Sequence, residues 1–228
     1  MSEQDQDSSA LEKTRVLIVD DHPIVRQGIK MLLDQEPDML VCGEAESAAE
    51  ALAGIEKSKP DVVIVDLALK ESSGLDLIKD IKIRYPKLRV LVLSMRDESF
   101  YAERVLRAGA LGYITKEEGT EKVVEGIRRI LDGEVYVSEK LSARIVKEWV
   151  SGGVGATKPS LEKLTDREMQ VFELIGNGLP TREIAKKLHI SVKTIDSHRE
   201  HIKDKLNIDN AADLLKHAIQ WVQCHGGP

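Results

Sequence analysis

Five short apolar runs alternate with helical segments over residues 15–133, and this alternation limits the fold more than any other feature of the chain. The runs are RVLIVD (15–20), MLVCGEA (39–45), VVIVD (62–66), RVLVLS (89–94) and LGYIT (111–115). Each is rich in β-branched residues and nearly continuous in apolar residues, which is typical of a strand buried on both faces of a sheet. Five successive β-α units predict a doubly wound parallel sheet with helices on both faces. They are too few to close an eight-stranded barrel.

Helical periodicity marks the segments between these runs. The first predicted helix begins at Pro23, a residue whose fixed φ suits the first helical turn, and contains Ile24, Ile29, Leu32 and Leu33. The others cover Ala48–Ile55, Leu75–Ile83, Ala102–Ala108 and Val123–Leu131.

The chain divides into four parts by composition and period. Residues 1–13 are acidic and polar and are predicted to be disordered, and residues 14–135 form the α/β domain. Residues 136–160 contain an amphipathic helix (138–150) and a flexible linker, VSGGVGATKPS. Residues 161–228 form a small all-α domain of four short helices. Their start signals are a capping box at Thr165–Glu168, Pro180, and the N-caps Ser191 and Asn210.

Composition excludes several classes of protein. The two cysteines, Cys42 and Cys224, have neither disulfide-framework nor zinc spacing, which fits a reducing compartment. The N-terminus lacks the positive and apolar regions of a signal peptide. No apolar run approaches the ~20 residues that cross a bilayer. We therefore predict a cytoplasmic protein without a membrane segment.

Polar residues stand at the carboxyl ends of four predicted strands. Asp20 and Asp21 end the first run, Asp66 the third and Ser94 the fourth, and Lys116 follows the fifth. With the flavodoxin-like order 2-1-3-4-5, these ends meet at one edge, where sites form in such sheets. Three adjacent carboxylates need protons or a cation, and hard oxygen ligands suit Mg²⁺ shared with a phosphate. A single Asp there is usually a turn former, but the joint occurrence favours a site at which Asp66 carries a phosphoryl group.

Residues 15–133 resemble a two-component receiver domain through VDDH, VDLALKESSG, VLVLS and GALGYITK. The resemblance implies that Asp66 is the phosphoacceptor and that Asp21 binds Mg²⁺ directly, with Asp20 acting through water. It also implies that the backbone carbonyl of Ala68 completes the metal shell. Ser94 and Tyr113 match the switch pair, in which the hydroxyl turns toward the phosphoryl group and the ring follows inward. Lys116 matches the family's lysine.

The third helix of the small domain, residues 192–206, has two distinct faces. One stripe holds Val192, Ile195, Ile202 and Leu206 and is predicted to be core, while the opposite face is polar. A short turn followed by such a helix is typical of helix-turn-helix DNA binding. By spacing alone, a solvated surface helix is an equally good interpretation.

Residues 164–206 resemble a LuxR-type output domain, in LTDRE, EIA and VKTI with His198-Arg199. The resemblance implies that the third helix enters the DNA major groove. The DNA-contacting residues that it implies are Lys193, Thr194, Asp196, Ser197, Arg199, Glu200 and Lys203. Asp196, Ser197 and Glu200 are expected to read bases, and the others to contact phosphates or brace the helix. Packing is the favoured role of His198.

The last helix carries candidates for a dimer surface. These are Leu214, Leu215, Ala218 and Trp221. Residues 161–228 contain ten Lys or Arg and ten Asp or Glu, a net charge of zero. Because non-specific affinity comes from phosphate neutralisation, a single domain is expected to bind DNA weakly, and dimerisation would compensate.

The whole chain resembles a response regulator of the NarL/FixJ family, which predicts a DNA-binding transcription regulator rather than an enzyme. The expected partners are a histidine kinase that phosphorylates Asp66 with Mg²⁺, promoter DNA and a second copy of the chain. Two alternatives stand beside this prediction. One is a phosphatase of the haloacid dehalogenase kind, which needs a second Asp where Ala68 stands. The other is a receiver-controlled regulator that acts through protein or RNA binding.

Overall fold

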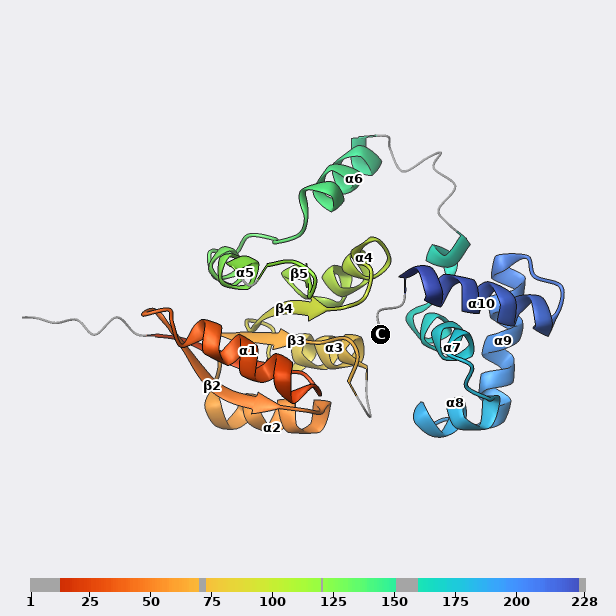
Figure 1. The fold of residues 1–228 in the computed structure, drawn as a ribbon, viewed down its shortest axis with the longest axis horizontal. Coiled ribbons are helices and arrows are strands. Elements are labelled where there is room, and N and C mark those ends of the chain that lie inside the picture. The colour runs from red at the N-terminus through yellow and green to blue at the C-terminus, as the bar shows by residue number, and fades with distance from the viewer. Residues whose placement is uncertain (1–12, 70–72, 120, 151–159, 226–228) are drawn as a thin grey trace, which may run out of the picture.

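The computed structural model describes residues 13–69, 73–119, 121–150 and 160–225 (Figure 1). Its N-terminal domain is built around one five-stranded sheet. The strands are β1 (Thr14–Val19), β2 (Met39–Ala45), β3 (Val62–Val65), β4 (Arg89–Ser94) and β5 (Gly112–Thr115). Every neighbouring pair is parallel, and the order is β2-β1-β3-β4-β5. The predicted sheet and its strand order are therefore confirmed.

Helices connect the strands and cover both faces of the sheet. They are α1 (Pro23–Leu33), α2 (Ala48–Ser58), α3 (Gly74–Arg84), α4 (Glu98–Ala108) and α5 (Glu121–Leu131). Successive side chains of a strand point to opposite faces. Ile18 and Ile64 accordingly pack with the apolar residues of α1 and α5, whereas Leu17 and Val63 pack with those of α2, α3 and α4.

Strand β2 departs from the predicted burial on both faces. Its Leu40 is 42% exposed, and its Glu44 is exposed as well. The physical reason is position: β2 is an edge strand that pairs only with β1, so its outer side lacks a neighbour. An apolar run alone does not distinguish an edge strand from a central one.

Helix α6 (Glu139–Val150) follows the sheet domain, as predicted for the linker helix. Its Leu141 is buried, and the Ser138 backbone N–H donates to Glu98 Oε1 at 2.9 Å. The Arg144 guanidinium donates to the backbone carbonyl of Ser99 at 2.9 Å. These contacts tie α6 to the first turn of α4. Of the predicted disordered N-terminus only Lys13 is described, and linker residues 151–159 lie outside the described residues.

The C-terminal domain consists of helices, as predicted. They are η1 (Ser160–Lys163), α7 (Asp166–Gly176), α8 (Thr181–Lys187), α9 (Val192–Leu206) and α10 (Ala211–His225). The predicted capping box of α7 is present in full, and Ser191 and Asn210 cap α9 and α10. A Cβ on Gly176 would lie 2.4 Å from the Ala218 carbonyl oxygen, so glycine allows α7 and α10 to pack closely. None of the helices in the described residues is both long and apolar enough to cross a membrane.

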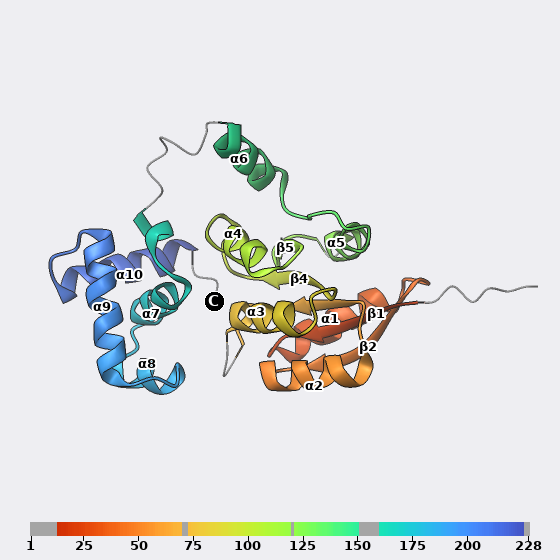
Figure 2. The ribbon, with the colours of Figure 1, turned by 180° about the vertical axis from the view of Figure 1, so that it is seen from behind.

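The two domains contact each other through α3 and α4 on one side and α7 and α10 on the other (Figures 1 and 2). Asp166 accepts from Lys79 Nζ at 2.6 Å and from Arg104 at 2.9 Å. The rings of Phe100 and Trp221 meet edge to face, with centroids 5.7 Å apart. The chain therefore adopts a closed arrangement, a feature that the sequence does not predict.

Candidate phosphoacceptor site and nucleic-acid interface

The carboxyl edge of the sheet gathers the polar residues predicted to meet there. Asp20 follows β1, Asp66 follows β3, Ser94 ends β4 and Lys116 lies just past β5. The Asp20, Asp66 and Ser94 residues are buried, at 2%, 3% and 0% exposure. Because β1, β3 and β4 are neighbours in the sheet, residues 28 or more positions apart in the chain become adjacent. The predicted convergence is therefore present.

Lys116 links two of these carboxylates. Its Nζ lies 2.6 Å from Asp20 Oδ2 and 2.7 Å from Asp66 Oδ2. Burial opposes the lysine charge, but Asp66 and Asp20 outweigh it, so the pKa of Lys116 is raised above its usual value. Lys116 is thus a fixed positive charge beside Asp66.

The acidic cluster also fits a divalent cation. Ligand atoms of Asp20, Asp21, His22 and Asp66 all lie within 4.8 Å of one another. Asp21 Oδ1 is buried without a hydrogen-bond partner, although His22 Nδ1 lies 2.7 Å away in an unaligned geometry. A buried oxygen without a donor is costly, and a cation would satisfy it. The carboxylate oxygens are the ligands that Mg²⁺ prefers.

Local backbone structure places the Asp66 side chain. The N–H of Ala68 donates to Asp66 Oδ1 at 3.3 Å, and Ser73 caps the following helix, α3. A Cβ on Gly74 would lie 2.1 Å from the Asp66 carbonyl oxygen. Only glycine lets the start of α3 pass so close to Asp66.

The Ser94 and Tyr113 pair meets at the backbone of Arg96. Ser94 Oγ accepts from the Arg96 N–H at 3.4 Å, and the Tyr113 hydroxyl donates to the Arg96 carbonyl at 2.7 Å. Tyr113 is 1% exposed, and burial raises the pKa of its phenol far above the usual value. Its ring is already inside the domain, so the inward ring movement implied by the resemblance has no counterpart in this arrangement.

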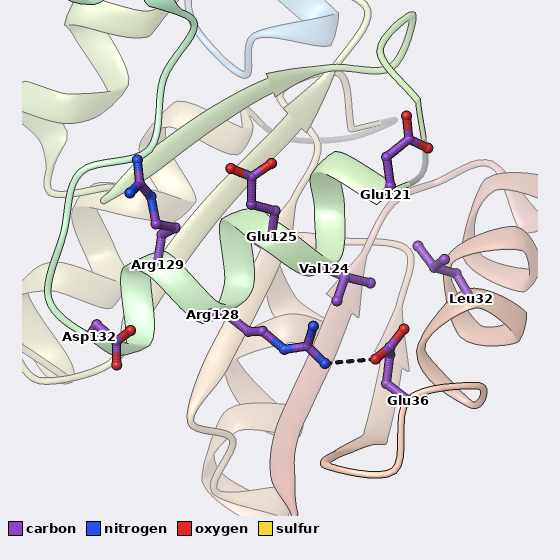
Figure 3. Close-up of a pocket in the computed structure, with 8 residues that line it drawn as sticks. All are labelled: Leu32, Glu36, Glu121, Val124, Glu125, Arg128, Arg129 and Asp132. Atoms are coloured by element: carbon purple, nitrogen blue, oxygen red, sulfur yellow. Dashed lines mark hydrogen bonds and ion pairs between the residues drawn. The ribbon is translucent and has the colours of Figure 1, made fainter.

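Of two hollows lined by described residues, only the second reaches the carboxyl edge of the sheet. The hollow between α1 and α5, about 470 Å³ in volume, is lined by Leu32, Val124 and mostly charged side chains (Figure 3). Arg128 of α5 crosses it to Glu36 at 2.7 Å, so this ion pair joins α5 to the turn that follows α1. The second hollow, about 620 Å³, lies between the domains and reaches from Asp21 and Ala68 to the C-terminal domain.

Helix α9 presents a polar face to solvent. Its exposed residues are Lys193, Thr194, Asp196, Ser197 and Glu200, whereas Ile195 and Ile202 are fully buried. Thr194 Oγ1 and Ser191 Oγ lie 2.7 Å apart, and Ser197 Oγ donates to the Lys193 carbonyl at 3.1 Å. The face predicted to meet DNA is therefore exposed while the receiver-like domain is in place.

Four other residues of α9 refine the sequence interpretation. Val192 was predicted to be core but is 42% exposed, because it is the first residue of the helix and no other element covers it. Arg199 is half-buried and lies 3.4 Å from Thr181 Oγ1, a bracing contact. Lys203 pairs with Glu200 at 2.8 Å. Burial lowers the pKa of the half-buried His198, which favours the neutral, packed role predicted for it.

The structure corrects the dimer surface predicted on α10. Leu214 and Ala218 are 0% exposed, since this face of α10 packs on α7. Trp221 is 6% exposed and packs against Phe100 and Phe172. Only Leu215 among the four candidates is exposed, at 41%. The apolar residues of α10 are mostly core. Periodicity could not distinguish packing within the same domain from packing against a second copy of the chain.

Sequence reasoning missed three residues. His22 stands between the carboxylates, and its place in VDDH was the available signal. Arg96 and Glu173 form an ion pair between the domains, 77 residues apart. Neither residue belongs to a motif, so nothing in the sequence connects them.

Comparisons with known proteins agree with this geometry. Residues 16–128 match the response regulator receiver domain model, and residues 162–218 match the model of bacterial regulatory proteins of the luxR family. The oxygen regulatory protein NreC of Staphylococcus epidermidis is 35% identical over 211 residues, covering 90% of this chain and 97% of the relative. NreC of Staphylococcus aureus is 36% identical over 210 residues, with the same shares.

Solved structures of RcsB are similar over nearly the whole chain. RcsB of Salmonella typhimurium aligns with a TM-score of 0.71 and 28% identity, covering 92% of this chain and 98% of that one. RcsB of Salmonella enterica serovar Typhimurium, bound to promoter P1flhDC in the presence of the phosphomimetic BeF3⁻, aligns with a TM-score of 0.69 and 30% identity, covering 92% and 100%. With its acidic sheet edge and its exposed α9, the chain is a two-component response regulator of the NarL/FixJ family, built from a receiver domain and a LuxR-type DNA-binding domain.

Proposed function

We propose that this response regulator is switched on by phosphorylation of Asp66 and then binds promoter DNA as a dimer. The observation that carries the proposal is the position of Lys116, whose Nζ lies within 2.7 Å of both Asp66 and Asp20. When Asp66 is phosphorylated, the negative charge moves from its carboxylate to the phosphoryl oxygens. The Lys116 ammonium is close enough to pair with those oxygens instead. A turn-forming Asp would have no need of this buried arrangement.

The phosphodonor is a phosphohistidine of the partner kinase. An Asp66 carboxylate oxygen attacks phosphorus, the O–P bond forms, and the P–N bond breaks as the imidazole leaves. Lys116 pairs with the phosphoryl oxygens, and the Ser94 hydroxyl donates to one of them. Asp20, Asp21, Asp66 and the Ala68 carbonyl would hold Mg²⁺. When bound there, Mg²⁺ would supply positive charge that offsets the negative charge of the phosphoryl group.

The output is recognition of double-stranded DNA by α9. Lys193 and Thr194 lie at its N-terminal end, where the helix dipole favours a phosphate. Asp196, Ser197 and Glu200 are exposed, and in this function they would meet the base edges. The similarity to RcsB bound to promoter DNA supports this assignment. A kinase donor and a DNA target both fit action in the cytoplasm.

The test compares phosphorylated and unphosphorylated protein on the genome. Footprinting with the wild type and with Asp66→Ala should reveal promoter sites that require Asp66. Binding to RNA with no preference for any duplex would instead support the RNA-binding alternative. Release of inorganic phosphate from small phosphate esters would support the phosphatase, against which Ala68 argues because that class needs an Asp there.

A further inference from the structure

Arg96 connects the switch pair of the receiver to the output domain. Its backbone N–H donates to Ser94 Oγ at 3.4 Å, and its carbonyl accepts from the Tyr113 hydroxyl at 2.7 Å. Its guanidinium donates to the Tyr101 hydroxyl at 2.9 Å and to Glu173 Oε1 on α7. One residue therefore contacts both members of the switch pair through its backbone and the output domain through its side chain.

Glu173 depends on this contact. It is 5% exposed, and among the described residues Arg96 is the cation that pairs with its carboxylate. Burial raises the pKa of Glu173 even though Arg96 opposes the shift. A buried carboxylate that loses its only cation is strongly destabilised where it stands, so a displaced Arg96 favours separation of the two surfaces.

Other contacts between the domains accompany this pair. Lys79 and Arg104 hold Asp166, and Phe100 covers Trp221. Arg104 also donates to the backbone carbonyl of Leu164 at 2.8 Å, just before α7. These contacts fall on α7, on α10 and on the segment that leads into α7. Within the described residues, none of these contacts between the domains reaches the exposed face of α9, from Lys193 to Glu200.

We propose that the Arg96–Glu173 pair locks the receiver onto the α7–α10 face and leaves the DNA-reading face of α9 free. Phosphorylation draws the Ser94 hydroxyl away from the Arg96 N–H, moves the Arg96 loop and releases the lock. The receiver then controls whether two output domains can pair, and it does not control whether one output domain can reach DNA. This inference rests on the proposed function, because it assumes that Asp66 phosphorylation is the signal.

Two predictions for DNA affinity distinguish this lock from an arrangement in which the receiver covers the DNA-reading face of α9. Affinity for a duplex with one half-site should be the same within about twofold with and without the phosphoryl mimic BeF3⁻. Affinity for a duplex with two half-sites should rise by about tenfold or more with BeF3⁻, because pairing adds the second contact. Glu173→Gln should tighten binding to two half-sites without BeF3⁻. Its half-site affinity should stay that of the wild type.

A second readout follows the lock without DNA. In a Trp149→Phe background, acrylamide quenching of Trp221 fluorescence reports whether Phe100 still covers it. At a concentration where sedimentation shows monomer, quenching should increase with Glu173→Gln and with Arg96→Gln, each changing one side of the pair. Glu103→Gln, which removes an ion pair with Arg107 on α4 itself, is the matched control and should leave quenching unchanged. Circular dichroism verifies that each variant is folded.

The outcomes are distinct. A half-site affinity that rises more than about tenfold with BeF3⁻ would overturn the lock, since α9 would then be masked in solution. Quenching unchanged in both Arg96→Gln and Glu173→Gln would overturn the role of the pair. If no form of the protein binds any selected duplex, the proposed DNA function fails, while the quenching measurement still decides whether the lock exists.

Discussion

The acceptor edge of the receiver and the reading face of α9 are built in opposite ways. Asp20, Asp66 and Ser94 are almost completely buried, and Lys116 contacts both carboxylates. The α9 face is exposed, and its side chains contact mainly their own helix and its cap. Chemistry on one carboxylate needs charges positioned before the reaction. A surface that meets a polyanion needs only a rigid helix and open access.

This difference bears on how the receiver would act on the output domain. In the proposed function, phosphorylation changes the charge of the acceptor edge, whereas the α9 face is already exposed without it. The proposed lock accordingly lies between the two regions, where the receiver meets α7 and α10. The predictions below test whether the two regions are as different as their construction suggests.

Replacement of Asp66 should have the largest effect. Asp66→Ala removes the acceptor carboxylate, so incubation with acetyl phosphate and Mg²⁺ should add no phosphoryl group. Intact mass spectrometry measures this directly, and the wild type should gain one group. The exposed Asp80→Ala variant is the control and should gain mass as the wild type does. A phosphorylated Asp66→Ala protein would contradict the assignment, as would labelling of the wild type without Mg²⁺.

Replacement of Lys116 should reveal how strongly the buried edge depends on a cation. Lys116→Ala leaves Asp20 and Asp66 unneutralised, which should lower the free energy of unfolding by about 3–5 kcal/mol. Mg²⁺ should restore much of this loss, because it supplies the missing positive charge. Urea titrations with and without Mg²⁺ measure both effects. Lys122→Ala, which changes an exposed side chain on α5, is the control and should change little. Equal losses with and without Mg²⁺ would argue against a metal site here.

The phosphoryl mimic should promote dimers. BeF3⁻ with Mg²⁺ should lower the dimer dissociation constant by about 30-fold, or about 2 kcal/mol, a usual size for coupling between sites. Opening should expose Trp221 and add it to the already exposed Leu215. Sedimentation velocity over micromolar concentrations measures the change, with Asp66→Ala as the control. An unchanged monomer fraction would show that the closed contact does not restrain pairing.

Glu200 should affect base preference. A carboxylate near phosphates is unfavourable unless it accepts from a base such as cytosine N4. Glu200→Ala also frees Lys203 from its 2.8 Å pair. Non-specific binding should stay equal or tighten, while preference at one base pair relaxes by about 1–3 kcal/mol. Titration of a selected site and its single-base mutants measures this. Weakening of all sites in parallel would refute a reading role.

Lys193 should give the smallest effect, spread evenly over sequences. Lys193→Ala removes one phosphate contact, so affinity should fall alike for every duplex and the salt slope should decrease by about one. A salt series on specific and random duplexes provides the measurement. Lys216→Ala, exposed on α10, is the control. A changed base preference with an unaltered salt slope would reverse the roles given to Lys193 and Glu200.

Local patterns predicted most elements well because they depend on neighbours in the chain. The apolar runs located all five strands within about two residues, the accuracy expected of boundaries. The Thr165–Glu168 capping box and the Ser191 and Asn210 caps marked helix starts correctly, since a cap bonds to residues two or three positions away. Burial was predicted less well. Leu40, Val192 and Leu214 were misjudged because exposure depends on which distant element covers a side chain.

The sequence by itself determined which chemical groups stand at the strand ends and which residues face outward from α9. A parallel sheet brings its carboxyl ends to one edge, so Asp20, Asp66 and Lys116 could be grouped in advance. Only the tertiary structure decided that Arg96 meets Glu173 and that Phe100 covers Trp221. These contacts join residues 77 and 121 positions apart in two separate domains. No local preference encodes such a pairing, because it depends on the shape and charge of the surfaces of two folded domains.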